Sequence, residues 1–131
     1  MSQPPLLTLE GVTKRFGGLT AVSDVSFAVT AGDLLGIIGP NGAGKTTLFN
    51  VISGYYRADS GRVIFAGQDV VGQPPHVICR MGLTGTFQLE KPFGNLSVVD
   101  NVMIGVLTRL APIRAALVEA DRVIAACGLA A

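Results

Sequence analysis

The amino-acid sequence predicts an α/β fold with a sheet-rich first part and a helical last part. Three observations indicate this class. Apolar and polar residues alternate near the N-terminus, which is typical of half-buried strands. An apolar run at Leu34–Ile38 leads through a glycine-rich loop into a helical pattern. From Ser97 onward, apolar residues recur at three- and four-residue steps, which is typical of amphipathic helices.

The first expected strands belong to an antiparallel part of the sheet. Leu6–Glu10 is one of them, and the alternation across residues 25–29 marks another. Leu34–Ile38 is an almost continuous apolar run that ends at Gly39 and Pro40. This pattern predicts a strand buried on both faces.

Helices and strands then alternate along the middle of the chain. Apolar residues after Thr46 fall at helical spacing, and Gly54 provides a stop for a short helix. Arg62–Phe65 lies between glycine-containing turns and is expected to be a strand. A second short helix is expected within residues 74–82, because two prolines open it and a glycine closes it. Leu83–Phe87 is expected to be a further strand.

The last third of the sequence predicts two helices. Ser97 and Asp100 have the spacing of a capping box, which marks a helix start. Ile113–Cys127 carries an apolar stripe whose opposite face holds charges of both signs, so it is expected to be core of a helical subdomain rather than a membrane-surface helix. We therefore expect a β-rich part over residues 1–96 and the beginning of a helical part over residues 97–131.

Composition and charge exclude several classes of function. Ten Lys and Arg residues against nine Asp and Glu residues give a net charge of +1. The lysines and arginines are scattered along the chain rather than clustered, so nucleic acid is not an expected partner. Cys79 and Cys127 form no CxxC pair and one histidine accompanies them, which disfavours a disulfide framework or zinc cluster. Both are expected to be inert core thiols in a reducing cytosol. Apolar runs such as Val102–Leu107 are too short to span a membrane.

The glycine-rich loop carries the strongest functional signal in the sequence. It reads Gly39, Pro40, Asn41, Gly42, Ala43, Gly44, Lys45, Thr46. This is the GxxxxGK[ST] phosphate-binding motif, and an expected strand and helix flank it, as the motif requires. Glycines allow backbone N–H groups to converge on phosphate oxygens, Lys45 supplies a positive charge, and the Thr46 hydroxyl suits magnesium. The motif predicts a P-loop NTPase-type core, and the alternative is a glycine turn with an incidental lysine.

Beyond this loop, the chain resembles the nucleotide-binding subunits of ABC transporters. The resemblance rests on Gly39–Thr47, on Thr13–Gly18 upstream and on Thr86–Gln88 downstream. Phe93 and the segment Leu96–Val102 make it most similar to the ATPase subunits of branched-chain amino-acid importers. It extends over nearly the whole chain but over only about half of the family's domain.

The resemblance implies ATP and Mg²⁺ as cofactors and assigns roles to individual residues. Phe16 would stack on adenine, although a single phenylalanine is more often part of a core. Gln88 would be the glutamine that ligands magnesium or orients water, although a polar residue at a strand end has the same spacing. Lys45 and Gln88 would be catalytic, and Thr46 and Gln88 would contact the metal. The implied nucleotide-binding residues are Phe16, Gly39, Asn41, Gly42, Ala43, Gly44, Lys45, Thr46 and Thr47.

The resemblance also implies partners and a location. Gln88–Asn95 would dock a membrane permease, and a second ATPase subunit would complete the site, on the cytoplasmic face of the membrane. The family's signature motif, Walker B carboxylates and switch histidine do not occur in the chain. We therefore expect the chain alone to bind ATP with turnover near background, whereas its parent protein hydrolyses ATP. Two alternatives are a non-catalytic nucleotide-binding fragment and another P-loop class, a small kinase or GTPase, although the guanine-reading Asn-Lys-x-Asp is absent.

Overall fold

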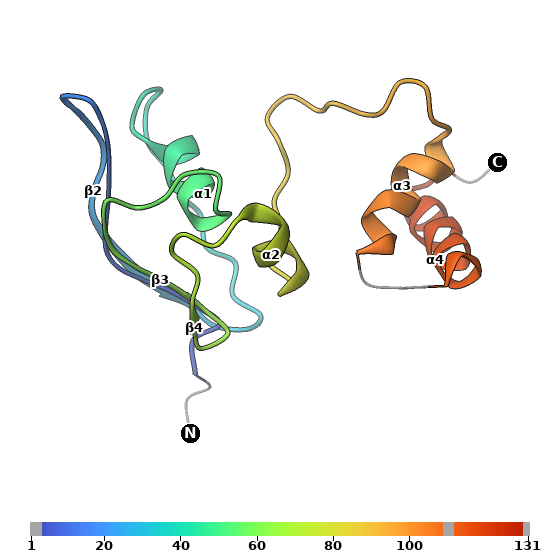
Figure 1. Ribbon diagram of the computed structural model, residues 1–131, viewed down its shortest axis with the longest axis horizontal. Coiled ribbons are helices and arrows are strands. Elements are labelled where there is room, and N and C mark those ends of the chain that lie inside the picture. Colours follow the sequence, from blue (N-terminus) through green and yellow to red (C-terminus); the bar gives the residue numbers. More distant parts are fainter. Residues whose placement is uncertain (1–3, 109–111, 130–131) are drawn as a thin grey trace. The chain divides into compact units, whose positions relative to one another are not determined.

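The computed structural model describes residues 4–108 and 112–129, which belong to two compact units, Met1–Gly85 and Thr86–Ala131 (Figure 1). The first unit combines a sheet with two short helices, and the second is helical, so the α/β class is confirmed. The elements, in chain order, are β1 (Leu7–Phe16), β2 (Leu19–Val29), α1 (Lys45–Ile52), β3 (Ser60–Phe65), β4 (Gln68–Asp69), α2 (Pro75–Arg80), α3 (Val98–Leu107) and α4 (Ile113–Ala126).

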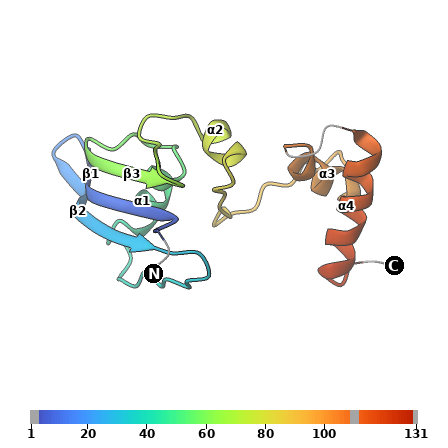
Figure 2. The same cartoon turned by 90° about the horizontal axis from the view of Figure 1, so that it is seen from below.

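The sheet is antiparallel, with the strand order β2-β1-β3-β4. Figure 2 shows β1 between β2 and β3. Leu7 pairs with Val29 on one side and with Phe65 on the other, so β1 is the central strand. The β1-β2 hairpin turns through two glycines, and Gly17 adopts a φ of 56°. A two-residue turn of this kind matches the twist of the flanking strands. The hairpin places Phe16 beside the tight turn.

A bulge in β1 allows residues three positions apart to face the same core. The register shifts between Glu10 and Thr13 relative to β3, and Gly11 adopts a φ of 58° there. In a regular strand, Leu9 and Val12 would point to opposite faces. The extra residue of the bulge restores a common face, and both side chains are buried.

The core of the first unit lies between the sheet and α1. Leu48, Val51 and Ile52 of α1 are buried, as the helical spacing predicted. The remaining buried apolar residues of this core come from the sheet, from its connections and from α2; they are Leu9, Val12, Val22, Ala58, Val63, Phe65, Val70 and Ile78. Burial of these side chains supplies the main stabilising free energy of the unit.

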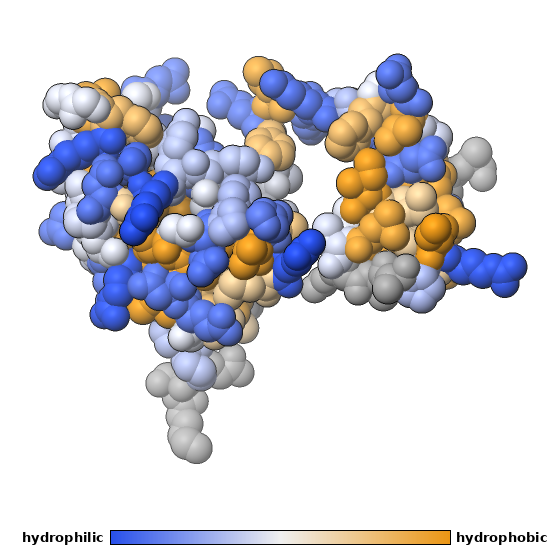
Figure 3. Space-filling model, in the orientation of Figure 1, coloured by the Kyte–Doolittle hydropathy of each residue, from blue (hydrophilic) through white to orange (hydrophobic). Residues whose placement is uncertain are grey.

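Two expected strands are wrong. Leu34–Ile38 and Leu83–Phe87 do not form strands, and the side chains of Leu34 and Ile38 are almost fully exposed. The apolar composition of a segment favours a buried strand, but a strand forms only where a neighbour offers backbone hydrogen bonds. In the described residues, neither segment belongs to the sheet. Apolar side chains consequently remain on the surface of the molecule (Figure 3).

The second unit contains the helical pair α3 and α4. The capping box at the start of α3 is confirmed, because the Ser97 hydroxyl accepts from the Asp100 N–H and the Asp100 carboxylate accepts from the Ser97 N–H. The buried residues of α4, Ala116, Ala120 and Ile124, recur every four positions and form its core stripe. The expectation that Cys127 is a core thiol is wrong: it follows α4 and is exposed. Among the described helices, none is long and apolar enough to cross a membrane.

Candidate functional site

The glycine-rich loop follows segment 34–38, which forms no helix or strand, and ends at the first turn of α1. Gly42 and Gly44 adopt left-handed φ values of 84° and 86°, which glycine reaches without a steric penalty. The N–H of Ala43 donates to the carbonyl of Pro40 at 3.2 Å and closes a turn. The chain therefore folds back on itself immediately before α1 begins.

The N-terminus of α1 is open to an anion. Gly44 is the N-cap residue and offers no side-chain acceptor to the first N–H groups, and the first turn contains no acidic residue. Unpaired N–H groups and the positive end of the helix dipole favour a negatively charged group at this place. Thr46 is exposed and Thr47 is half-buried in this turn, which makes the Thr46 hydroxyl the more accessible one.

Lys45 holds its positive charge directly over the loop. Its ammonium group donates to the carbonyl oxygens of Gly39, at 2.5 Å, and Pro40, at 2.7 Å. Both partners are neutral carbonyl groups, so neither of them neutralises the positive charge of the ammonium beside the loop. An incoming phosphate oxygen would exchange these neutral contacts for a charge-assisted one, which is the stronger kind of hydrogen bond.

The loop is fixed to the sheet at Gly44. A Cβ atom at this position would overlap the carbonyl oxygen of Ala21 in β2. Glycine is therefore required here for two reasons, the left-handed backbone and the close approach of a neighbouring strand. Because Ala21 lies five residues beyond Phe16, the same contact brings the loop to the β1-β2 hairpin.

A hollow of about 430 Å³ lies beside the loop. Side chains of β2, together with Ile37, Ile38, residues 43–45 and Leu48, line it. Among these lining residues, only Lys45 carries a charge. The volume falls in the range of pockets that hold small molecules, and the lining combines an apolar wall with one cationic group.

Phe16 lies at the end of β1 with 41% of its surface exposed. The ring of Tyr56 meets it edge to face, with ring centroids 5.2 Å apart and an interplanar angle of 77°. The Lys14 ammonium lies 5.3 Å from the Phe16 ring centroid. The Phe16 ring thus contacts a second aromatic ring and lies near a cation while part of its surface stays accessible, unlike a core phenylalanine.

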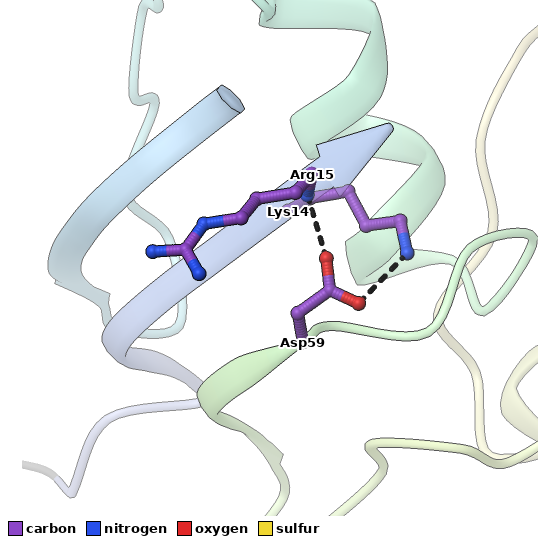
Figure 4. Close-up of polar contacts among 3 residues, drawn as sticks. All are labelled: Lys14, Arg15 and Asp59. Carbon is purple, nitrogen blue, oxygen red and sulfur yellow. Dashed lines mark hydrogen bonds and ion pairs between the residues drawn. The ribbon is translucent and has the colours of Figure 1, made fainter. Parts of the chain in front are cut away.

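Asp59 connects these groups to the backbone (Figure 4). Its carboxylate accepts from the N–H of Arg15 at 2.6 Å and from the Lys14 ammonium at 3.2 Å. The Arg15 N–H, and then the Lys14 hydrogen bond, hold the pKa of Asp59 below its usual range. The carboxylate is therefore charged at neutral pH. The guanidinium of Arg15 points away from it (Figure 4).

Sequence reasoning identified Phe16 but missed Tyr56 and Asp59. Both lie 40 or more residues further along the chain, and no spacing rule links them to Phe16. Asp59, which immediately precedes β3, was a detectable signal, because Asp commonly bonds nearby backbone where a turn leads into a strand. Only the pairing of β1 with β3 shows that its carboxylate reaches Arg15.

Gln88 belongs to the second unit, whereas Phe16 and the loop belong to the first. The segment from Gln88 to Asn95 contains no helix or strand, and its residues are exposed. The structure thus assembles the loop, its lysine and Phe16 within one unit and leaves the Gln88 role a prediction. Among the described residues, no cluster of three His, Cys, Asp or Glu side chains is arranged to hold a metal ion.

Comparison with known proteins gives a consistent result. Residues 22–131 match the family model described as ABC transporter. A probable branched-chain amino acid transport ATP-binding protein, LivG, of Archaeoglobus fulgidus is 43% identical over 76% of this chain and 38% of its own length. The high-affinity branched-chain amino acid transport ATP-binding protein LivG of Escherichia coli K12 is 41% identical over 79% of this chain and 40% of its own length. The chain thus spans about two fifths of these relatives.

Solved structures show the same similarity in three dimensions. The ADP conformation of an ATP-binding cassette of an ABC transporter superposes with a TM-score of 0.81 at 32% identity, covering 97% of this chain and 55% of that one. A nucleotide-free ATP-binding cassette superposes with a TM-score of 0.72 at 37% identity, covering 88% of this chain and 46% of that one.

Proposed function

This chain belongs to the ABC transporter family, as the match of residues 22–131 shows, and from that premise we propose that its first unit binds ATP. The observation that carries the proposal is the placement of Lys45: its ammonium lies over a glycine loop at the open N-terminus of α1. Convergent N–H groups and a cation form a site for a polyphosphate.

The residues of the loop have different roles in nucleotide binding. Gly42 and Gly44 let the backbone turn its N–H groups toward the phosphates, and Lys45 neutralises phosphate charge. Asn41 and Ala43 contribute their backbone N–H groups, and Gly39 starts the turn. Phe16, with 41% of its surface exposed, offers its aromatic ring for adenine to stack on. Stacking reads a ring rather than its hydrogen-bonding edge, so we propose little discrimination between ATP and GTP.

Magnesium fits the donors that the chain offers. Mg²⁺ prefers oxygen ligands and is commonly bound by one or two protein groups together with substrate phosphates. The accessible hydroxyl of Thr46 is such a donor, and the amide oxygen of Gln88 would be a second. When bound, the ion neutralises charge on the phosphates and favours phosphoryl transfer.

At the level of the whole protein, we propose ATP hydrolysis that powers an importer of branched-chain amino acids. The names of the relatives, at 41% and 43% identity, support this substrate class. Residues 1–96 would form the β-rich part of a nucleotide-binding domain and residues 97–131 the beginning of its helical subdomain. Lys45 and Gln88 would act in catalysis, and a second ATPase subunit would complete the site.

We propose that Gln88–Asn95 docks a membrane permease and so places the protein on the cytoplasmic face of the membrane. The segment is exposed throughout, and Phe93 presents a large apolar side chain with 58% of its surface accessible. An exposed aromatic anchor is a common contact in protein interfaces. A photo-crosslinker at Phe93 in cells should capture an integral membrane protein. Capture of soluble proteins alone would contradict the proposal.

Calorimetric titration with Mg-ATP tests the binding function. Lys45→Ala should weaken binding about ten-fold or more, because hydrogen bonds to charged groups contribute about 1.5–3 kcal/mol. Phe16→Ala should cost less, about 1–2 kcal/mol, for ATP and GTP alike. Arg80→Ala, which removes one exposed positive charge from α2, is the matched control. Equal affinities of the wild type and Lys45→Ala would refute ATP binding at this loop.

A further inference from the structure

The surroundings of Phe16 contain more interactions than an exposed ring at a strand end requires. Lysine is rarely covered unless its charge is paired, yet the Lys14 side chain is only 15% exposed. The arginine side chains of the other two ion pairs in the described residues, Arg62 with Glu10 and Arg122 with Glu119, are 61% and 77% exposed. The Lys14 ammonium contacts the Asp59 carboxylate at 3.2 Å and lies over the Phe16 ring, 5.3 Å from its centroid.

We propose that Lys14, Tyr56 and Asp59 are positioning residues that hold the Phe16 ring in place as the platform for the nucleotide base. This inference rests on the proposed function, in which Phe16 stacks on adenine. We call the three residues the platform clamp. Each of them reaches the ring or the backbone beside it through a contact described above.

Asp59 fixes the clamp to the main chain. Its carboxylate accepts from the N–H of Arg15, the residue immediately before Phe16, and its own N–H donates to the carbonyl of Thr13 at 2.9 Å. These two hydrogen bonds hold the last residues of β1 before the hairpin, Thr13 and Arg15. The same carboxylate orients the Lys14 ammonium toward the ring through a 3.2 Å contact. One side chain thus restrains both the backbone that carries Phe16 and the cation that contacts it.

Tyr56 links the platform to the phosphate loop. Its ring packs on Phe16, and its N–H donates to the carbonyl of Asn50 in α1 at 3.0 Å. The helix α1 begins at Lys45, so the same helix connects to the platform through Asn50 and to the loop through Lys45. A ring fixed before the nucleotide arrives loses less conformational entropy on binding, and base stacking then contributes more to affinity.

Two ligands that both contain three linked phosphates, only one of which has a base, test the platform clamp. The full chain is titrated with Mg-ATP and with magnesium tripolyphosphate, which has three linked phosphates but neither ribose nor base. Asp59→Asn, Lys14→Met and Tyr56→Ala should each weaken ATP binding about two- to five-fold, the size of one exposed cation–π or aromatic contact. Binding of tripolyphosphate should stay unchanged. Equal weakening of both probes would overturn the proposal, because it would indicate a general structural or electrostatic effect.

A matched control separates the clamp from ordinary strand pairing. Glu10→Gln breaks the Glu10–Arg62 ion pair between the same two strands, β1 and β3, and should leave ATP binding unchanged. If the clamp variants bind ATP as tightly as Glu10→Gln does while Phe16→Ala binds more weakly, the clamp is refuted and the stacking function stands. If Phe16→Ala also binds ATP like the wild type, both the clamp and the stacking are refuted.

A spectroscopic measurement tests the clamp without nucleotide. The chain contains no tryptophan, so Phe16→Trp introduces a single reporter at the platform. Adding Asp59→Asn or Lys14→Met to this variant should speed the local rotation of the reporter, measured by time-resolved fluorescence anisotropy. Adding Glu10→Gln should not. Identical local rotation in all of these variants would overturn the proposal.

Discussion

Gly42 and Gly44 share a left-handed backbone but differ in what surrounds them. Nothing lies within 4 Å of a Cβ atom built on Gly42, whereas one built on Gly44 overlaps the Ala21 carbonyl. The first glycine is therefore needed for its dihedral angles alone. The second is needed also because the loop packs directly on β2.

This difference leads to a prediction at the scale of single residues. Gly42→Ala should lower the free energy of unfolding by about 1–2 kcal/mol, the usual cost of a left-handed L-residue. Gly44→Ala should lower it further and weaken ATP binding more strongly, because β2 and the loop must separate. Urea unfolding followed by circular dichroism measures the first effect, and calorimetry the second. Equal losses for the two variants would show that the contact with Ala21 does not matter.

At the scale of elements, hydrogen bonds from one residue of α3 hold residues 93–97, the segment immediately before the helix. The side-chain oxygen of Asn101 accepts from the N–H of Phe93 at 2.8 Å. Its side-chain amide donates to the carbonyls of Phe93, Leu96 and Ser97 at 3.1, 3.3 and 2.9 Å. Asn101 lies in the first turns of a regular helix. Its hydrogen bonds therefore restrain residues 93–97, which belong to no strand or helix themselves.

Removal of this network should loosen the segment locally. Asn101→Ala should speed the hydrogen exchange of the Phe93 amide about five-fold, which corresponds to the roughly 1 kcal/mol of one hydrogen bond. Asn95→Ala, at an exposed asparagine of the same segment, is the matched control and should leave this rate unchanged. Unchanged exchange of Phe93 in Asn101→Ala would mean that the network does not order the segment in solution.

At the scale of the whole molecule, apolar side chains divide into two very different environments. Leu9 is 1% exposed at the centre of the sheet, whereas Ile38, beside the glycine loop, is 97% exposed. Burial removes apolar surface from water and stabilises the fold, and an exposed isoleucine contributes nothing of this kind. The stability of the first unit therefore resides mainly between the sheet and α1, and the exposed Ile38 side chain contributes little to it.

Two truncations of similar size test this division. Leu9→Ala should reduce the free energy of unfolding by about 2–5 kcal/mol, because it leaves a cavity in the core. Ile38→Ala should change it by about 0.5 kcal/mol or less, as is usual for surface positions. Both values come from chemical denaturation of the full chain. A large loss for Ile38→Ala would show that this segment is covered in solution.

The sequence by itself determined the features that depend on neighbouring residues. The glycine loop before α1, the capping box of Ser97 and Asp100, and the apolar stripe of α4 all follow from spacing of a few positions, and the structure contains each of them. Their physical basis is local, since turns, caps and helical faces involve residues close together in the chain.

Only the tertiary structure decided the features that depend on distant partners. Leu34–Ile38 has the composition of a buried strand, yet its state depends on whether another strand lies beside it. The contacts of Phe16 with Tyr56, and of Lys14 with Asp59, join residues 40 or more positions apart. The physical reason is that hydrogen-bond pairing and side-chain packing are satisfied in space, where the register of β1 against β3 places these groups together.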